Sequence, residues 1–160
     1  MSLKEDVKKS LENNTGSLKM FLKDINEEES LARPDQNINH IRWIVGHIVV
    51  HAEMMLKILK GNMEMPEGWD NMFAYKSQLL DDTSQYPSMK ELLDKYDDIY
   101  NSMYARLENM SDEELKQEFG EFWGKKEIRS NGIQWLGKHE YYHMGQITLI
   151  RKMLGKPTLI

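Results

Sequence analysis

The chain has 160 residues, no cysteine and a net charge of −5, which is enough length for one domain over residues 1–160 whose core needs no disulfide. Any metal site must therefore use nitrogen and oxygen ligands, and the acidic balance argues against a nucleic-acid partner because such surfaces are usually basic. The first residues are charged and no apolar stretch approaches the ~18 residues of a membrane span, so we expect a cytoplasmic protein with no membrane partner.

Helical periodicity dominates the sequence and predicts a first helix over residues 3–26 and a second over residues 38–60. Apolar side chains recur at helical spacing in both segments, and Gly61 supplies the stop signal of the second. A long connection follows over residues 63–87. We expect it to be mostly irregular, with room for a short helix at residues 73–80, because a loop of this length is usually functional or mobile.

The second half of the chain predicts two more long helices. Ser88 caps a helix over residues 88–109, and a capping box at residues 111–114 starts a short turn. Residues 119–126 are expected to be an aromatic, glycine-bearing connector rather than a strand pair. The last helix covers residues 131–154 and is followed by a glycine and a proline, the usual order at a helix end. These elements predict an all-α four-helix bundle with at least one long crossover.

The five histidines carry most of the functional information: His40, His47, His51, His139 and His143. At 100° per residue, the first three share one side of the second helix and the last two share the inward side of the last helix. A buried imidazole needs a hydrogen bond or a metal, and metal sites in bundles use inward side chains on facing helices. The pattern therefore favours a divalent-metal site over ordinary core histidines. Spacing alone does not decide between His47 and His51 as a ligand.

The run from His139 to His143 also matches H-E-x-x-H, the zinc-binding motif of metalloproteases. That interpretation needs a third ligand downstream, but residues 144–160 contain no Asp, Glu or His. No edge strand is predicted that would hold a peptide substrate. We therefore treat the match as incidental. Glu140 is left with three interpretations: it orients a ligand imidazole, faces a polar seam, or is a partly exposed helix carboxylate.

Two motifs together resemble the DinB-like (YfiT-like) superfamily over nearly the whole chain: Trp43-Ile44-Val45-Gly46-His47 and His139-x-x-x-His143-x-Gly145-Gln146. The resemblance implies an up-down-down-up four-helix bundle, often dimeric, so a homodimer is expected. It also implies a divalent metal, nickel or zinc, held by three histidines. Matched residue by residue, these are His47, His139 and His143.

The resemblance also places the neighbours of these ligands. His51 then lies beside the ligands or in the cavity, and His40 is structural or sits at the mouth. Gln146 is a candidate to hydrogen-bond a ligand ring, because such contacts fix the orientation of metal-binding histidines. Gly145 is expected to permit close helix packing, and the alternative is a glycine that the helix simply tolerates.

The chemistry implied by the resemblance is less specific than the fold. Several relatives transfer or isomerise substrates with low-molecular-weight thiols such as bacillithiol, mycothiol or glutathione, and others have been labelled metal-dependent hydrolases. We predict a metal-dependent thiol S-transferase that acts on a small electrophilic substrate held under the 63–87 loop. The alternatives are hydrolysis of a small ester or amide, with Glu140 or Glu53 as candidate base, and a non-catalytic, stress-associated metal-binding bundle. The remaining alternative to a metal-binding protein is a helical interaction protein whose histidines are ordinary core residues.

Overall fold

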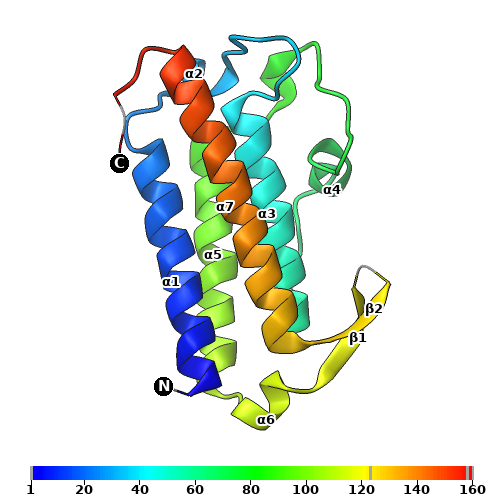
Figure 1. The fold of residues 1–160 in the computed structure, drawn as a ribbon. Coiled ribbons are helices and arrows are strands. Elements are labelled where there is room, and N and C mark those ends of the chain that lie inside the picture. The colour runs from blue at the N-terminus through cyan, green and yellow to red at the C-terminus, as the bar shows by residue number, and fades with distance from the viewer. Residues whose placement is uncertain (1, 123, 158, 160) are drawn as a thin grey trace.

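Four long helices form the body of the molecule in the computed structural model, which describes residues 2–122, 124–157 and 159 (Figure 1). They are α1 (Leu3–Leu22), α3 (Ile41–Ile58), α5 (Met89–Glu108) and α7 (Arg129–Met153). Helices α1 and α7 run in one direction and α3 and α5 in the other, so the order along the chain is up, down, down, up (Figure 1). The prediction of an all-α four-helix bundle is confirmed.

Helix α3 is the most deeply buried element, because it packs against both α5 and α7. Residues 41–49 of α3 are all buried, which is typical of a helix covered on every side. Its apolar side chains meet those of the neighbouring helices in one continuous core. Any polar side chain in this stretch must therefore find its partner inside the protein. In the part of the chain that the structure describes, no helix is both long and apolar enough to cross a membrane.

The ends of the first two predicted helices are wrong by a few residues. Helix α1 stops at Leu22, and Asn26 caps a separate short helix, α2 (Glu27–Leu31), by accepting a hydrogen bond from the backbone of Glu29. The second helix starts at Ile41 rather than residue 38, because the side chain of His40 caps it. The start and end of α5 and the end of α7 agree closely with the sequence, since Ser88 makes the expected capping box.

The long connection between α3 and α5 holds two short helical turns, α4 (Trp69–Met72) and the 3-10 turn η1 (Thr83–Gln85). The predicted helix over residues 73–80 is therefore wrong. Gly68 takes a positive φ of 82° and lets the chain turn into α4 earlier than expected. Helix α4 lies against the side of α3, where the indole Nε1 of Trp43 donates a hydrogen bond to the carbonyl of Met72 at 3.1 Å.

The expected connector over residues 119–126 is instead an antiparallel hairpin of β1 (Glu118–Phe122) and β2 (Lys125–Ile128), which follows the short helix α6 (Asp112–Leu115). The sequence signal was weak because half of the hairpin side chains are both exposed and charged. Gly124 takes a positive φ of 74° between the two strands. Phe119 and Phe122 pack against the core and hold the hairpin beside the first turns of α7 (Figure 1).

Candidate metal centre

Four histidines from two helices converge between α3 and α7. His47 and His51 lie one turn apart on α3, and His139 and His143 lie one turn apart on α7. One ligand nitrogen from each of His47, His51 and His139 lies within 4.8 Å of the other two. The Nε2 atom of His143 lies 3.2 Å from Nε2 of His139. The structure thus brings both predicted histidine pairs into one cluster.

The backbone of the long connection fixes the orientation of His47. Its Nδ1 lies 2.6 Å from the carbonyl oxygen of Phe73. A carbonyl oxygen can only accept, so Nδ1 carries the proton and Nε2 of the neutral ring keeps its lone pair. Trp43 stacks on the same imidazole, with ring centroids 4.9 Å apart and planes 12° apart. His47 is therefore oriented with the lone pair of Nε2 available to a metal before a metal binds.

An amide side chain on α7 fixes His143 in the same way. The Oε1 atom of Gln146 lies 2.8 Å from Nδ1 of His143, while Gln146 Nε2 donates to the hydroxyl of Tyr142 at 3.2 Å. The bond to Tyr142 sets the amide orientation, so Oε1 accepts from Nδ1 and leaves the lone pair of His143 on Nε2. Metal-binding histidines usually donate a hydrogen bond from the N–H of their second ring nitrogen in this manner.

All four imidazoles are neutral near pH 7, because burial disfavours their charged form. Burial lowers the pKa of His51 to about 3 and that of His143 to about 4, with neighbouring imidazoles adding to both shifts. Burial also lowers the pKa of His47 and of His139 below the ordinary value of 6.5. A neutral imidazole is the form that binds metal.

The cluster fits a divalent cation. Two nitrogens bound to one zinc at about 2.1 Å in tetrahedral geometry lie about 3.4 Å apart, close to the 3.2 Å between His139 and His143. The Nδ1 atoms of His51 and His139 are buried with no hydrogen-bond partner among the described residues. No described Asp or Glu joins the group of possible ligand atoms. The donors are all imidazole nitrogens, which suit zinc and nickel.

Glu140 lies outside the histidine cluster although it follows His139 directly. Its side chain is fully buried and points between α1 and α5, where Oε2 accepts hydrogen bonds from Tyr100 at 2.7 Å, Asn14 at 2.9 Å and Tyr96 at 3.3 Å. The interpretation as a partly exposed helix carboxylate is wrong, since the side chain has no exposed surface. Burial raises its pKa from 4.5 to about 7, against the opposing effect of these hydrogen bonds.

The remaining predicted residues have other surroundings. Glu53 is buried on α3 and pairs with Nζ of Lys57 at 2.8 Å. His40 is structural, because its Nδ1 accepts a hydrogen bond from the backbone of Trp43 at 3.0 Å. The expectation for Gly145 is wrong. A Cβ atom at this position would meet nothing within 4 Å, so the glycine does not serve close packing.

Sequence reasoning missed the contribution of Phe73, whose carbonyl orients His47. The signal was Gly46, next to His47: a Cβ atom there would lie 2.3 Å from the ring of Phe73. The absence of a side chain at Gly46 thus lets the connection approach α3. Trp135 was missed as well. It stacks on His139 with centroids 5.5 Å and planes 12° apart.

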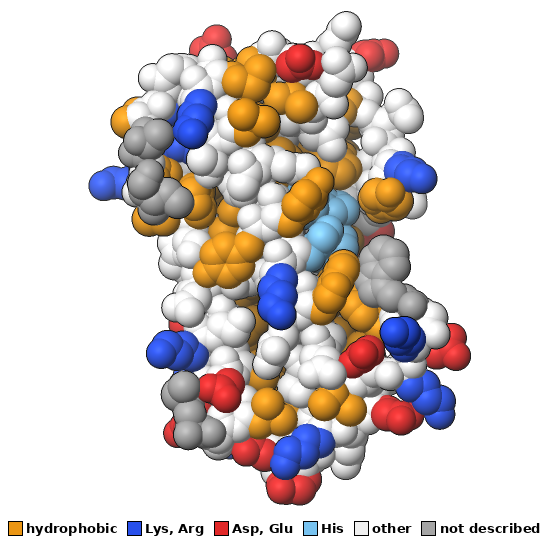
Figure 2. All heavy atoms as spheres, viewed as in Figure 1, with side chains coloured by type: hydrophobic (Ala, Val, Ile, Leu, Met, Phe, Trp, Pro, Cys, Tyr) orange, Lys and Arg blue, Asp and Glu red, His pale blue; other side chains and the backbone are white. Residues whose placement is uncertain are grey.

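The site is reachable from outside. Histidine side chains appear at the surface between hydrophobic side chains in Figure 2. His51 and His139 are partly exposed, whereas His47 and His143 are buried. Small molecules can therefore approach from the side of His51 and His139.

Comparison with known proteins places the chain in a family. The model of the DinB superfamily matches residues 10–147, so the chain belongs to the DinB superfamily. The resemblance seen in the sequence is confirmed. No curated protein matches the chain.

Solved structures with the same fold include a DinB-like protein from Bacillus cereus, with a TM-score of 0.73 and 19% identity over 94% of this chain and 92% of that one. A conserved protein from Enterococcus faecalis has a TM-score of 0.72 and 16% identity over 98% and 99%. YfiT from Bacillus subtilis, described as a probable metal-dependent hydrolase with an unusual four-helix bundle topology, has a TM-score of 0.68 and 16% identity over 96% and 89%. At these identities the likeness shows the fold alone.

Proposed function

We propose that the chain is a divalent-metal-dependent transferase that joins a low-molecular-weight thiol to a small electrophilic molecule, with nickel or zinc as the metal. The single observation behind the proposal is the convergence of neutral imidazoles with no carboxylate among the described ligand atoms. Such a donor set leaves the charge of a divalent cation uncompensated. An anionic ligand, such as a thiolate, is then favoured at the site.

We assign His47, His139 and His143 as the ligands, as the family motif implies. The carbonyl of Phe73 and the amide of Gln146 support this choice, because they hold His47 and His143 with Nε2 free. Neither His51 nor His139 has such a partner for its Nδ1, so the choice of His139 over His51 rests on the family motif. His51 then lines the cavity beside the ligands, where its neutral ring can accept a hydrogen bond from a bound thiol or substrate.

The bound cation supplies stabilisation of a thiolate over a thiol, which makes the sulfur nucleophilic near neutral pH. The sulfur forms its bond to the electrophilic carbon as the leaving group departs with the bonding electron pair, and the thiol proton passes to solvent. Trp43 and Trp135 stack on site histidines, restrain their rings and keep water away from two sides. The thiol itself is the nucleophile, so this reaction needs no carboxylate base.

Hydrolysis of a small ester or amide is the second candidate, favoured by the description of YfiT as a probable metal-dependent hydrolase. A hydrolase of this kind needs a base for water, for which Glu140 and Glu53 were the sequence candidates. Glu140 binds Asn14 and two tyrosines, and Glu53 pairs with Lys57. Neither contact brings a carboxylate to the histidines, which is why we prefer the thiol reaction.

One assay separates these candidates. Protein loaded with nickel or zinc is incubated with a panel of thiols and a panel of small electrophiles, each with and without the other, and products are followed by mass spectrometry. We expect thiol conjugates that disappear when the thiol, the metal or His139 is removed. Ester or amide cleavage without thiol would instead establish the hydrolase. Metal binding with neither product would establish a non-catalytic bundle.

A further inference from the structure

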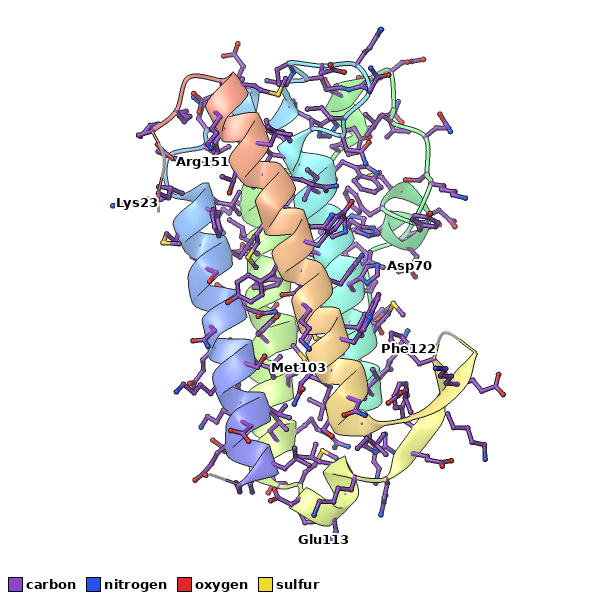
Figure 3. The ribbon with its side chains drawn as sticks, viewed as in Figure 1. Lys23, Asp70, Met103, Glu113, Phe122 and Arg151 are labelled. Atoms are coloured by element: carbon purple, nitrogen blue, oxygen red, sulfur yellow. The ribbon has the colours of Figure 1, made fainter. Side chains whose placement is uncertain are left out.

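A cavity lies next to the histidine cluster, between the hairpin and the start of α7. It has a volume of about 390 Å³, within the usual range for small-molecule sites. Its lining residues come from β1, β2 and α7: Phe122, Lys125, Glu127, Asn131, Gln134, Trp135 and Lys138. Figure 3 labels Phe122 on the hairpin beside α7. The unexpected hairpin therefore builds one wall of this cavity, which we call the hairpin pocket.

The hairpin pocket adjoins the candidate metal centre through one aromatic ring. Trp135 lines the pocket and stacks on His139, with ring centroids 5.5 Å apart. Phe122 packs edge-on against the same indole at 5.2 Å. A molecule lying on Trp135 would thus sit one ring layer from a site imidazole, and its far end could reach the metal centre past the partly exposed His139.

The polar lining of the pocket selects an anion. Lys125 and Lys138 both contribute to it, and neither ammonium group has a carboxylate at ion-pair distance within the described part of the chain. By contrast, Lys126 pairs with Glu118 at 3.5 Å across the hairpin. The pocket carboxylate of Glu127 is engaged by Asn131, whose Nδ2 donates to it at 2.9 Å. Two ammonium groups without an ion pair therefore face the same pocket.

We propose that the hairpin pocket binds the anionic part of a small carboxylate-bearing cosubstrate, with Lys125 and Lys138 contacting the carboxylate and Trp135 contacting the apolar body. The two lysines act as point charges on flexible stems, so they recognise charge rather than one exact geometry. The amides of Asn131 and Gln134 add hydrogen-bonding groups to the lining. The role as a cosubstrate site rests on the proposed function, whereas anion binding can be measured without metal or turnover.

The test uses benzoate and its neutral isostere benzamide as probes. Binding to the metal-free full chain is followed by NMR through the indole N–H resonance of Trp135, assigned with the Trp135→Phe variant. We expect benzoate to shift this resonance and to bind about tenfold more tightly than benzamide, a preference that weakens at high salt because the charges are exposed.

Matched variants separate a local contact from net charge. Lys125→Gln/Lys138→Gln removes the two pocket cations, and Lys126→Gln/Lys152→Gln removes two exposed cations outside the pocket from the same elements. Benzoate affinity should fall about tenfold in the first variant and less than about twofold in the second. Equal binding of benzoate and benzamide, or equal losses in both double variants, would overturn the proposal. Unchanged metal content in all variants would show that such a failure does not touch the metal centre.

Discussion

Replacing Glu140 by Gln should remove the decrease in the free energy of unfolding that the buried carboxyl group causes as the pH rises. The carboxyl group is fully buried, and both its Oε1 and the Oδ1 of Asn14 have no hydrogen-bond partner among the described residues. Burial raises the pKa of Glu140 from 4.5 to about 7, so the folded protein holds the proton more tightly than the unfolded chain does. The stabilisation from this group is complete below pH 4.5 and is lost as the pH rises towards 7.

The size of the effect follows from the pKa shift. A change from 4.5 to about 7 corresponds to roughly 3 kcal/mol in the free energy of unfolding. Glutamine has the shape of the neutral acid and can still accept hydrogen bonds from Tyr100 and Asn14. We therefore expect Glu140→Gln to match the wild type at pH 5 within about 1 kcal/mol and to exceed it by about 2 to 3 kcal/mol at pH 8.

The assay is urea unfolding followed by circular dichroism at several pH values, with a chelator present so that metal binding makes no contribution. Taking the difference between the free energies of unfolding of the two proteins cancels the contribution of histidine titration, which is common to both. Glu140→Ala is the control, and it should be less stable at every pH because it leaves a cavity and three buried donors without their acceptor. A stability difference between Glu140→Gln and wild type that does not change with pH would refute the reasoning.

Substitutions at three further positions test the residues around the site. Gly46→Ala should lower the free energy of unfolding by about 1–3 kcal/mol and weaken metal binding, because the new methyl group displaces Phe73. Gly145→Ala, with open space around it, should be neutral or stabilising by up to about 1 kcal/mol. Thermal unfolding and metal titration of Gly46→Ala and Gly145→Ala check both expectations. His40→Asn should keep the helix cap, whereas His40→Ala should cost about 1 kcal/mol in urea unfolding at pH 7.

His40 also makes a pH prediction. Burial lowers its pKa from 6.5 to about 4, so its contribution to stability is present above pH 6.5 and is lost as the pH falls through 4. His40→Asn, which does not titrate, should lose less stability than the wild type between pH 7 and pH 4.5 in urea unfolding measured with a chelator. An equal loss in both proteins would contradict the assignment of His40 as a neutral cap.

The pairing of the histidines on each helix could be predicted from sequence because it depends on helical periodicity. His47 and His51, like His139 and His143, are four residues apart, and a four-residue step returns a side chain to the same face of a helix. The apolar side chains of α3 further predict that the face of this helix that carries His47 and His51 points inward. Helix ends were less predictable, since His40 and Asn26 act as caps through side-chain hydrogen bonds that many sequences could make.

The missing parts of the site depend on long-range packing. The carbonyl of Phe73 is 26 residues from His47, and no pattern of side chains predicts which backbone carbonyl accepts such a hydrogen bond. The sequence could not decide between the three interpretations of Glu140, because its hydrogen-bond partners lie on α1 and α5, far away in the sequence. The hairpin was not predicted because half of its side chains are both charged and exposed. Its two phenylalanines gain their burial only by docking onto the bundle.

The most direct test of the metal centre is the metal content of purified protein after loading with zinc or nickel, measured by mass spectrometry for the wild type, His47→Ala, His139→Ala, His143→Ala and the control His40→Asn. We expect one equivalent of metal in the wild type and in His40→Asn. The three alanine variants should lose most of it while their circular dichroism remains helical. Full metal content in His47→Ala and His139→Ala would contradict a centre built from both helices, as would a folded wild type that takes up no metal.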